Sequence, residues 1–472
     1  MQQGIRSVVQ LASGIVCLLL LSLAAHSQSD KGELPLPGQI VDVACSADST
    51  QSYALYLPSN YTIAKRWPIV YFFDPAGRGR RPVELYRDLA EKYGFVIAGS
   101  NNSRNFSSNQ SQAVNAIWND THVRLAMDEH RTYASGFSGG ARVAGAMALN
   151  GSGQIAGVIA HGAGYPNTRG EGSDKLLYYF AVGNRDFNWT EVITDGHQRE
   201  KQNLPYRVRQ YAGTHQWAPP EVMDDAFQWI ILKEMQSGVI PPDQTFVDQQ
   251  FQRMQKEAED ASKRNDALAQ YEAYRSLASD FAKLKDVSGA SAKLALLKQS
   301  PALKAALKDE EDQIAEQMKI EREISPKLHA YESGNVPDMN SLRIEIQQAM
   351  AGLKNRAEHA KSEERQAVYA RAYDDMKVEG IENGQQEFQA RHFDKAESCF
   401  DLMRQTTDEP WPVLLRAETR VALGNKKQAI KDLREAVRRG LKDPEILTSD
   451  RHLEPLRSDP EFQKLLVDMK SK

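Results

Sequence analysis

Residues 132–150 read TYASGFSGGARVAGAMALN, a short run of strand-forming residues, then glycines, then an alanine-rich segment of helical character. Residues 136–140 (Gly-Phe-Ser-Gly-Gly) match the pattern G-x-S-x-G between a strand and a helix. A serine at so sharp a turn needs small neighbours, because strand and helix pass close on both sides. The stretch predicts a nucleophilic Ser138, with the Gly139 amide at a helix N-terminus where it can stabilise negative charge. The alternative is a Gly/Ser-rich loop that matches by chance.

The surrounding chain alternates between strands and helices. Residues 67–73 are apolar throughout, as in a central strand covered on both faces. Residues 39–45 and 52–57 are expected to form an antiparallel pair, and alternation beyond them favours a mainly parallel sheet with helices on both faces. The other predicted strands are 95–99, 132–135, 155–160, 176–182 and 206–211, and the predicted helices are 82–93, 114–127 and 221–236.

The composition changes after residue 237, where Lys, Glu, Ala, Gln and Leu dominate with helical spacing and no strand is evident. We therefore expect an α/β domain over residues 39–237, a helical region over 238–365 and a second helical domain over 366–472. Pro301 and Pro326 predict interruptions in the helices of the middle region.

A repeat is legible near the end of the chain. Residues 393–396 (Phe-Asp-Lys-Ala) recur as residues 426–429 (Lys-Lys-Gln-Ala), an offset of 33 residues, and bulky residues follow at Phe400 and Leu433. A period of about 34 residues resembles tetratricopeptide repeats, in which small residues let paired helices stack closely. Such repeats imply a binding surface for a protein partner. An ordinary helical bundle is the alternative.

The first residues predict export. Arg6 precedes an apolar run centred on residues 15–21, and small residues follow up to Ser27. This order is typical of a signal peptide over residues 1–27, with a flexible lead-in over 28–38 and a secreted or periplasmic product. An uncleaved membrane anchor is the alternative, although the run is short for one. No other stretch is apolar enough to span a membrane, and the net charge of −4 gives no sign of nucleic-acid binding.

The serine needs a base to take its proton and an acid to orient that base. Asp186 follows the strand over residues 176–182, and His215 follows the strand over 206–211, so both stand in strand-end loops in the order serine, acid, base. They are the predicted acid and base. The rival acids are Asp195 and Asp174.

His197 is the rival base, and His161 is a candidate pocket residue at the end of its strand. A second amide for the oxyanion is expected from the loop after residue 73, where Pro75 has no N–H and Ala76 or Gly77 must donate. An ordinary Gly-rich turn is the alternative.

Residues 40–236 resemble the α/β-hydrolase superfamily, and within it the secreted polyhydroxybutyrate-depolymerase, feruloyl-esterase and dienelactone-hydrolase-like esterases. The resemblance is carried by residues 136–140, 183–186 (Gly-Asn-Arg-Asp) and 213–217 (Gly-Thr-His-Gln-Trp). It implies ester hydrolysis through an acyl-enzyme, with no metal and no cofactor. The departure is Asp74-Pro75, where relatives commonly have His-Gly, because a carboxylate beside a developing oxyanion would oppose it.

Three residues are candidates for substrate contact. Trp189 and Trp217 flank the predicted acid and base loops and could form an aromatic wall, with core packing as the equal alternative. Arg142 lies one turn beyond the serine, where a structural salt bridge is at least as well supported. Two other functions stay open: a catalytically weakened hydrolase-fold scaffold, and a serine peptidase of the same fold.

Overall fold

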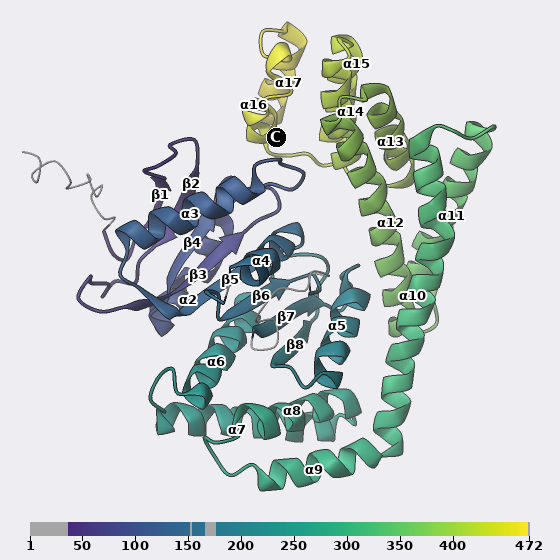
Figure 1. Ribbon diagram of the computed structural model, residues 1–472. Coiled ribbons are helices and arrows are strands. Elements are labelled where there is room, and N and C mark those ends of the chain that lie inside the picture. Colours follow the sequence, from purple (N-terminus) through teal and green to yellow (C-terminus); the bar gives the residue numbers. More distant parts are fainter. Residues whose placement is uncertain (1–35, 152, 166–175, 471–472) are drawn as a thin grey trace, which may run out of the picture.

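The computed structural model describes residues 36–151, 153–165 and 176–470. It consists of a sheet domain (residues 40–237) and a helical region (residues 244–470) that curves around it (Figure 1). The predicted signal peptide and most of the predicted lead-in lie outside the described residues. Among the helices of the described residues, none has the length and apolar character needed to cross a membrane.

The sheet has eight strands in the order β1-β2-β4-β3-β5-β6-β7-β8. Strands β3 to β8 pair in parallel, whereas β1 pairs with β2 and β2 with β4 in antiparallel fashion, as the sequence predicted for the opening pair. The strands are β1 Ile40–Ala44, β2 Ser52–Tyr56, β3 Trp67–Phe73, β4 Val96–Ser100, β5 Met127–Phe137, β6 Gly157–His161, β7 Leu177–Gly183 and β8 Tyr206–Tyr211.

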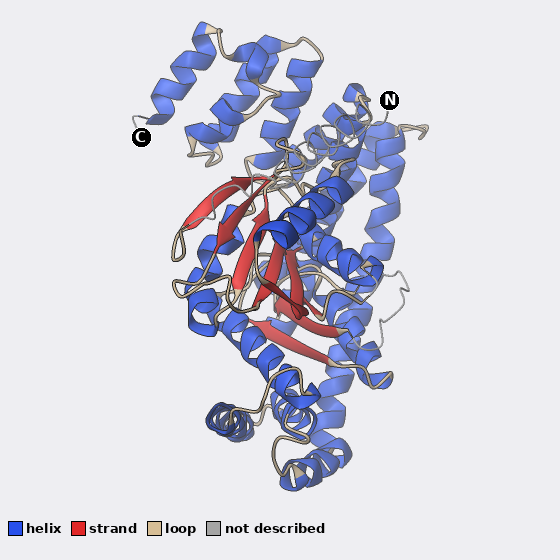
Figure 2. Cartoon of the chain, turned by 60° about the vertical axis from the view of Figure 1, so that its left-hand side comes forward, coloured by secondary structure: helices blue, strands red, loops and turns tan. Residues whose placement is uncertain are grey.

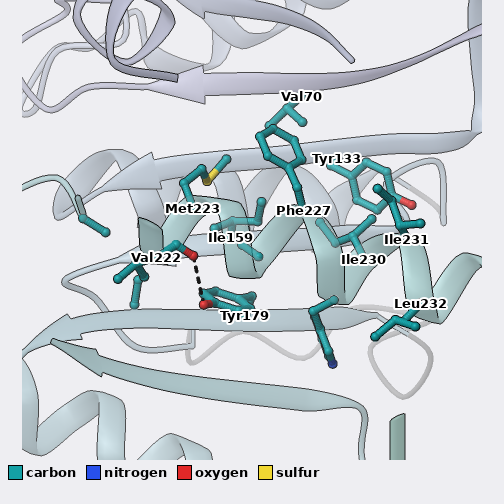
Figure 3. Close-up of a cluster of buried hydrophobic side chains, with 14 of the residues drawn as sticks. Val70, Tyr133, Ile159, Tyr179, Val222, Met223, Phe227, Ile230, Ile231 and Leu232 are labelled. Carbon is teal, nitrogen blue, oxygen red and sulfur yellow. Dashed lines mark hydrogen bonds between the residues drawn. The ribbon is translucent and has the colours of Figure 1, made fainter. Parts of the chain in front are cut away.

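Helices cover both faces of the sheet (Figure 2). On one face, α2 (Arg80–Tyr93) and α6 (Pro220–Ser237) pack on Val70 and Phe72 of β3. On the other, α3 (Gln110–Arg124), α4 (Gly139–Asn150) and α5 (Trp189–Lys201) share a core with Tyr71. Neighbouring residues of β3 therefore point into opposite cores, which explains why its sequence is apolar throughout. Figure 3 shows the first of these cores, where Met223 and Phe227 of α6 lie over the sheet.

The helical region contains no strand within its described residues, as predicted. Its first helices pack directly on the sheet domain, because Phe251 of α7 and Leu277 of α8 belong to the same core as α6. The helices are α7 Gln244–Lys263, α8 Ala267–Asp280, α9 Ser288–Gln299, α10 Pro301–Ser333, α11 Met339–His359, α12 Glu363–Gln389, α13 Phe393–Thr406, α14 Trp411–Ala422, α15 Lys426–Arg438, α16 Pro444–Ser449 and α17 Pro460–Lys470, with a 3-10 turn at Glu454–Leu456.

One predicted interruption is wrong. Pro301 does start a helix, but α10 runs through Pro326 without ending there. Ile320, Ile324 and Leu328 lie on one side of α10 and are buried in a core with α11 and α12. Burial of this apolar stripe outweighs the local cost of a proline inside the helix.

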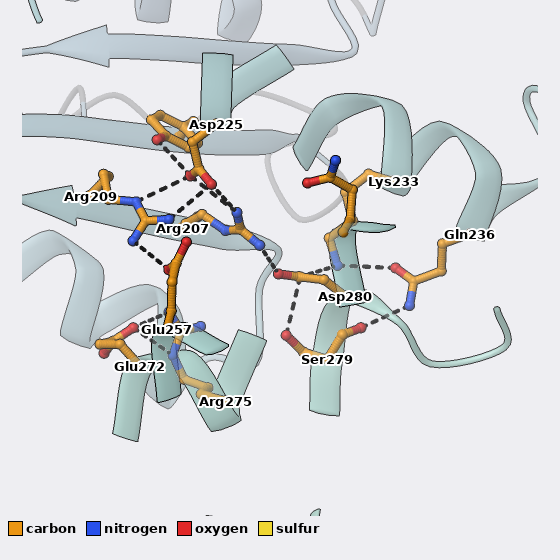
Figure 4. Close-up of polar contacts among 12 residues, drawn as sticks. Arg207, Arg209, Asp225, Lys233, Gln236, Glu257, Glu272, Arg275, Ser279 and Asp280 are labelled. Carbon is orange, nitrogen blue, oxygen red and sulfur yellow. Dashed lines mark hydrogen bonds and ion pairs between the residues drawn. The ribbon is translucent and has the colours of Figure 1, made fainter. Parts of the chain in front are cut away.

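A network of charged residues joins the helical region to the sheet domain (Figure 4). Arg207 of β8 pairs with Asp225 of α6 at 3.1 Å and with Asp280 at the end of α8 at 2.7 Å. Lys233 of α6 pairs with the same Asp280 at 2.7 Å. Arg207, Asp225 and Asp280 are all buried, so the connection depends on complete pairing of their charges.

Candidate active site

Ser138 occupies a strained turn between β5 and α4. Its φ of 53° and ψ of −123° lie outside the usual regions for a non-glycine residue, and its N–H donates to the carbonyl of His161 at 2.9 Å. A Cβ on Gly136 would lie 2.2 Å from the carbonyl oxygen of Gly140, and a Cβ on Gly140 would lie 1.9 Å from that of Phe73. Only glycines fit there, so the sequence motif is explained by the close approach of strand, turn and helix.

Asp186 and His215 are brought together from the loops after β7 and β8. Nδ1 of His215 lies 2.8 Å from Oδ1 of Asp186, and that carboxylate is buried and also accepts the Asn188 N–H at 2.9 Å. The His215 ring contacts the rings of Phe137 and Phe187, with centroid distances of 4.5 and 4.1 Å. The carboxylate fixes one ring nitrogen and the two aromatic rings fix the orientation of the imidazole.

The serine and this pair meet around the end of β6. A Cβ on Gly162 would lie 2.6 Å from Oδ2 of Asp186 and 3.1 Å from Nδ1 of His215, while the residue before it, His161, accepts from the backbone of Ser138. Within the described part of the chain, no hydrogen bond joins the Ser138 hydroxyl to the His215 ring. The Ser138 hydroxyl and the His215 ring thus lie near each other at one edge of the sheet, but they are not hydrogen-bonded in this structure.

The rival acids have other surroundings. Asp195 of α5 accepts the backbone N–H of Tyr165 at 2.5 Å, and burial raises its pKa to about 6. It has no bond to His215, whose carboxylate partner is Asp186. Asp174 lies outside the described residues.

The rival base also lies elsewhere. Nε2 of His197 is 3.0 Å from Glu310 of α10. His161 is fully buried and packs against Trp217 with a centroid distance of 5.0 Å, and it does not line the cavity beside Ser138. Burial lowers the pKa of His161 to about 3, and the ring is neutral at physiological pH.

The loop after β3 does not present the predicted second oxyanion donor. The Ala76 N–H donates to Oδ1 of Asp74 at 2.9 Å, and the Gly77 N–H donates to the Asp74 carbonyl at 2.9 Å. Both amides are engaged within their own turn, so the geometry gives no support to either as a donor to substrate. The Gly139 N–H, at the start of α4, has no intrahelical acceptor and is available.

Asp74 does not line the cavity that contains Ser138. Its carboxylate is fully buried, 3.0 Å from Nε of Arg78 and 3.0 Å from Nε1 of Trp217. The opposing charge that the sequence raised as a difficulty is therefore paired and turned into the core.

A cavity of about 580 Å³ opens over Ser138, and its far wall comes from α12. Ser138, Gly139 and Arg142 line one side, whereas Asp375, Glu379 and Glu382 line the other. No local sequence pattern marks these acidic residues as part of a site, because they follow Ser138 by more than 200 positions. The helical region thus forms part of the wall of the cavity beside Ser138.

The three predicted contact residues have different positions. Arg142 lines the cavity and forms a two-pronged ion pair with Glu191 at 2.6 and 2.8 Å. Trp217 is buried between the core and Asp74, and Trp189 is buried with its Nε1 on Gln210 at 2.8 Å. Neither tryptophan lines the cavity, so core packing is the better account of both.

One group of side chains among the described residues has the spacing of metal ligands. It consists of Glu418, Asp450 and His452 in the helical region, and none of them lines the Ser138 cavity. The groups around Ser138 are suited instead to proton transfer between a hydroxyl and an imidazole.

The strand order and the turn at Ser138 together define the fold of residues 40–237 as that of an α/β-hydrolase. No protein-family model matches the sequence, and no curated protein matches it.

Solved structures similar to this chain include serine hydrolases and esterases. FphF, a fluorophosphonate-binding serine hydrolase of Staphylococcus aureus, is 12% identical with a TM-score of 0.34, over 41% of this chain and 99% of that protein. S-formylglutathione hydrolase FrmB of the same organism is 13% identical with a TM-score of 0.34, over 42% of this chain and 100% of that protein. The ferulic acid esterase AmCE1/Fae1A of the fungus Anaeromyces mucronatus is 14% identical with a TM-score of 0.33, over 41% and 92%.

Proposed function

We propose that this chain is an exported serine hydrolase that cleaves carboxylic esters through an acyl-enzyme intermediate. The observation that carries the proposal is the 2.8 Å contact between His215 and the buried Asp186, placed beside the strained turn of Ser138. The nucleophile, the orienting acid and the base then stand in the loops that follow β5, β7 and β8.

The chemistry follows from these groups. Nε2 of His215 accepts the hydroxyl proton as Oγ of Ser138 attacks the ester carbonyl carbon, and the charged oxygen is stabilised by the Gly139 N–H. The imidazolium then gives that proton to the departing alcohol, which leaves an acyl group on Ser138. In the second half of the reaction His215 takes a proton from water as the water oxygen attacks the acyl carbon. It then returns that proton to Oγ of Ser138, and the carboxylic acid is released. Asp186 keeps Nδ1 protonated and stabilises the imidazolium throughout.

The free hydroxyl and ring are compatible with this mechanism, because such hydrogen bonds often tighten only with substrate bound. The export part of the proposal rests only on the predicted signal peptide, a type of segment that directs a protein out of the cell or into the periplasm. We also assign tetratricopeptide-like packing to α13–α15, supported by the fully buried Ala396 and Ala429 at equivalent positions of the repeat. A protein partner for these helices stays a prediction.

Hydrolysis of p-nitrophenyl esters and covalent labelling by a fluorophosphonate probe test the proposal. Ser138→Ala is expected to abolish labelling and to lower kcat about 10⁴-fold or more. Ser135→Ala is the matched control: it removes a buried hydroxyl three residues earlier, bonded to the Ile159 carbonyl at 2.9 Å, and is expected to keep activity. The proposal would be overturned if the wild-type chain were not labelled by the probe and hydrolysed no ester. Faster cleavage of peptide anilides than of esters with the same acyl group would favour a serine peptidase of the same fold.

A further inference from the structure

We propose that the side-chain amide of Asn105 is the second donor of the oxyanion hole, in place of a backbone amide from the loop after β3. The inference rests on the proposed function and adds a catalytic residue to it. Asn105 lies in the loop between β4 and α3, a part of the chain that the serine motif does not identify.

The oxyanion needs a second hydrogen-bond donor, and the backbone amides of the loop after β3 are not free to provide it. Acyl transfer places a negative charge on the carbonyl oxygen, and one amide at Gly139 supplies only part of the stabilisation that such enzymes use. Pro75 has no N–H, and the amides of Ala76 and Gly77 both donate to Asp74. The donor must come from another element that reaches the cavity beside Gly139.

Asn105 is in that place. A Cβ on Gly139 would lie 2.1 Å from Oδ1 and 2.4 Å from Nδ2 of Asn105, so the terminal amide packs directly on the backbone of Gly139. Asn105, Gly139 and Ser138 also line one cavity. A half-turn of the terminal amide exchanges its oxygen and nitrogen, and a developing negative charge selects the orientation with Nδ2 toward it.

The amide is also free to donate. Within the described residues, its side chain has no hydrogen-bond partner. Two asparagines of the same loop behave differently: Nδ2 of Asn101 donates to Oγ of Ser52 at 3.2 Å, and Nδ2 of Asn102 donates to the Thr50 carbonyl at 3.3 Å. Asn105 alone among the three keeps its donors for a group that enters the cavity.

The backbone at Asn105 is fixed by a hydrogen bond and by the unusual conformation of the next residue. Its N–H donates to the Pro75 carbonyl at 2.8 Å, which ties it to the loop that lacks a free amide. The next residue, Phe106, has a φ of 59°, an unfavourable conformation for a bulky side chain, and it lines the same cavity. Strain of this kind persists where the surroundings impose it, and it is concentrated at functional sites.

The test is a pair of near-isosteric substitutions measured with p-nitrophenyl esters. Asn105→Leu removes the donor, and we expect kcat to fall about 100-fold or more with KM changed little, because the bond forms only as the oxyanion develops. Asn105→Asp keeps the shape but places an acceptor there, and a still larger loss at neutral pH is expected. Asn101→Leu is the matched control and should stay within about threefold of wild type.

Binding of a trifluoromethyl ketone provides a readout that structural disturbance would not move in the same way. Its adduct with Ser138 carries an oxyanion, so Asn105→Leu should weaken its binding by the factor lost in kcat, while KM stays near that of wild type. Wild-type activity that depends on Ser138, together with kcat of both Asn105 variants within threefold of wild type, would overturn this inference alone. Absence of any activity in the wild type would overturn the proposed function instead.

Discussion

The guanidinium of Arg371 in α12 donates a hydrogen bond of 2.9 Å to the carbonyl oxygen of Asn184, 187 residues earlier and two residues before Asp186. Arg371 is 2% exposed and lies over the ring of Trp189 at 4.0 Å. Burial lowers the pKa of Arg371 to about 10. A buried guanidinium is thus stabilised by neutral partners where the helical region contacts residues 184–188, the loop after β7 that contains Asp186 (the acid loop).

A second bond holds the other side of the acid loop. Nε2 of Gln317 in α10 donates to the carbonyl of Phe187 at 3.0 Å, and Oε1 of Gln317 accepts from Nε of Arg371 at 2.9 Å. Asp186 stands between these two anchored carbonyls. The helical region therefore fixes the orientation of the acid and supplies a wall of the cavity, so we infer that hydrolysis requires both parts of the chain.

Arg371→Met is expected to lower kcat/KM about tenfold on p-nitrophenyl esters. The substitution keeps the apolar stem but leaves the Asn184 carbonyl without its donor, and the acid loop then has more freedom around Asp186. The loss should appear mainly in kcat, because a displaced Asp186 no longer holds the His215 ring in the orientation that proton transfer needs.

Arg416→Met is the control for that experiment. Arg416 is a buried arginine of α14 that pairs with Asp432, and it has no bond to the described residues of the sheet domain. We expect it to lower the free energy of unfolding while kcat/KM of the folded fraction stays near wild type. Equal kcat/KM values in the Arg371 variant and in wild type would show that the acid loop needs no support from α12.

Asp280→Asn is expected to reduce the free energy of unfolding by about 3 kcal/mol at pH 7, because Arg207 loses one of its two carboxylate partners and Lys233 loses its own. Burial alone would raise the pKa of Asp280, but the charges of Lys233 and Arg207 hold it well below its usual value. The stabilisation is therefore fully present above about pH 4 and disappears as the pH falls toward the folded-state pKa. Urea unfolding from pH 7 to pH 3 should show a smaller acid dependence in the variant, and an unchanged dependence would contradict the pairing.

The fold was predictable where the local pattern and the packing agree. The strand over residues 67–73 is apolar because both of its faces are covered, and the two properties have one cause. Helix α5 was not predicted, since Gly196 and a mixture of polar and apolar residues between 189 and 201 weaken the helical pattern. The break predicted at Pro326 failed for the opposite reason, because burial of one side of α10 outweighs local propensity.

The candidate site divides in the same way. Ser138, Asp186 and His215 could be named because each follows a strand, and the ends of parallel strands meet at one edge of a sheet. The engagement of the Ala76 and Gly77 amides by Asp74 depends on a turn whose hydrogen bonds no spacing specifies. The return of α12 to the cavity is a long-range contact, and no local pattern could reveal it.

Gly140→Ala is expected to disrupt the turn at Ser138 and to lower the free energy of unfolding by about 4 kcal/mol or more. Its Cβ would overlap the carbonyl oxygen of Phe73, a backbone atom that cannot move aside without displacing β3. Gly352→Ala in α11 is the matched control, because its Cβ would meet open space and helical alanine is favoured by about 1 kcal/mol. Thermal unfolding of both variants measures the difference, and a Gly140 variant as stable as wild type would show that the strand and helix can separate.

Asp375→Asn is expected to stabilise the chain at alkaline pH. Burial, together with the charges of Glu321 and Glu379, raises the pKa of Asp375 to about 8. The folded state then holds a proton that the unfolded state loses near pH 4, so wild-type stability should fall as the pH rises from about 4 to 8. At pH 9 the variant lacks the buried charge, so its free energy of unfolding should exceed that of wild type by at least about 1.4 kcal/mol, the equivalent of one pKa unit. Asp374 is the neighbouring residue and pairs with Lys377 at 2.7 Å, and Asp374→Asn should keep the wild-type pH dependence. If the free energy of unfolding depended on pH in the same way in wild type and in both variants, the prediction would be contradicted.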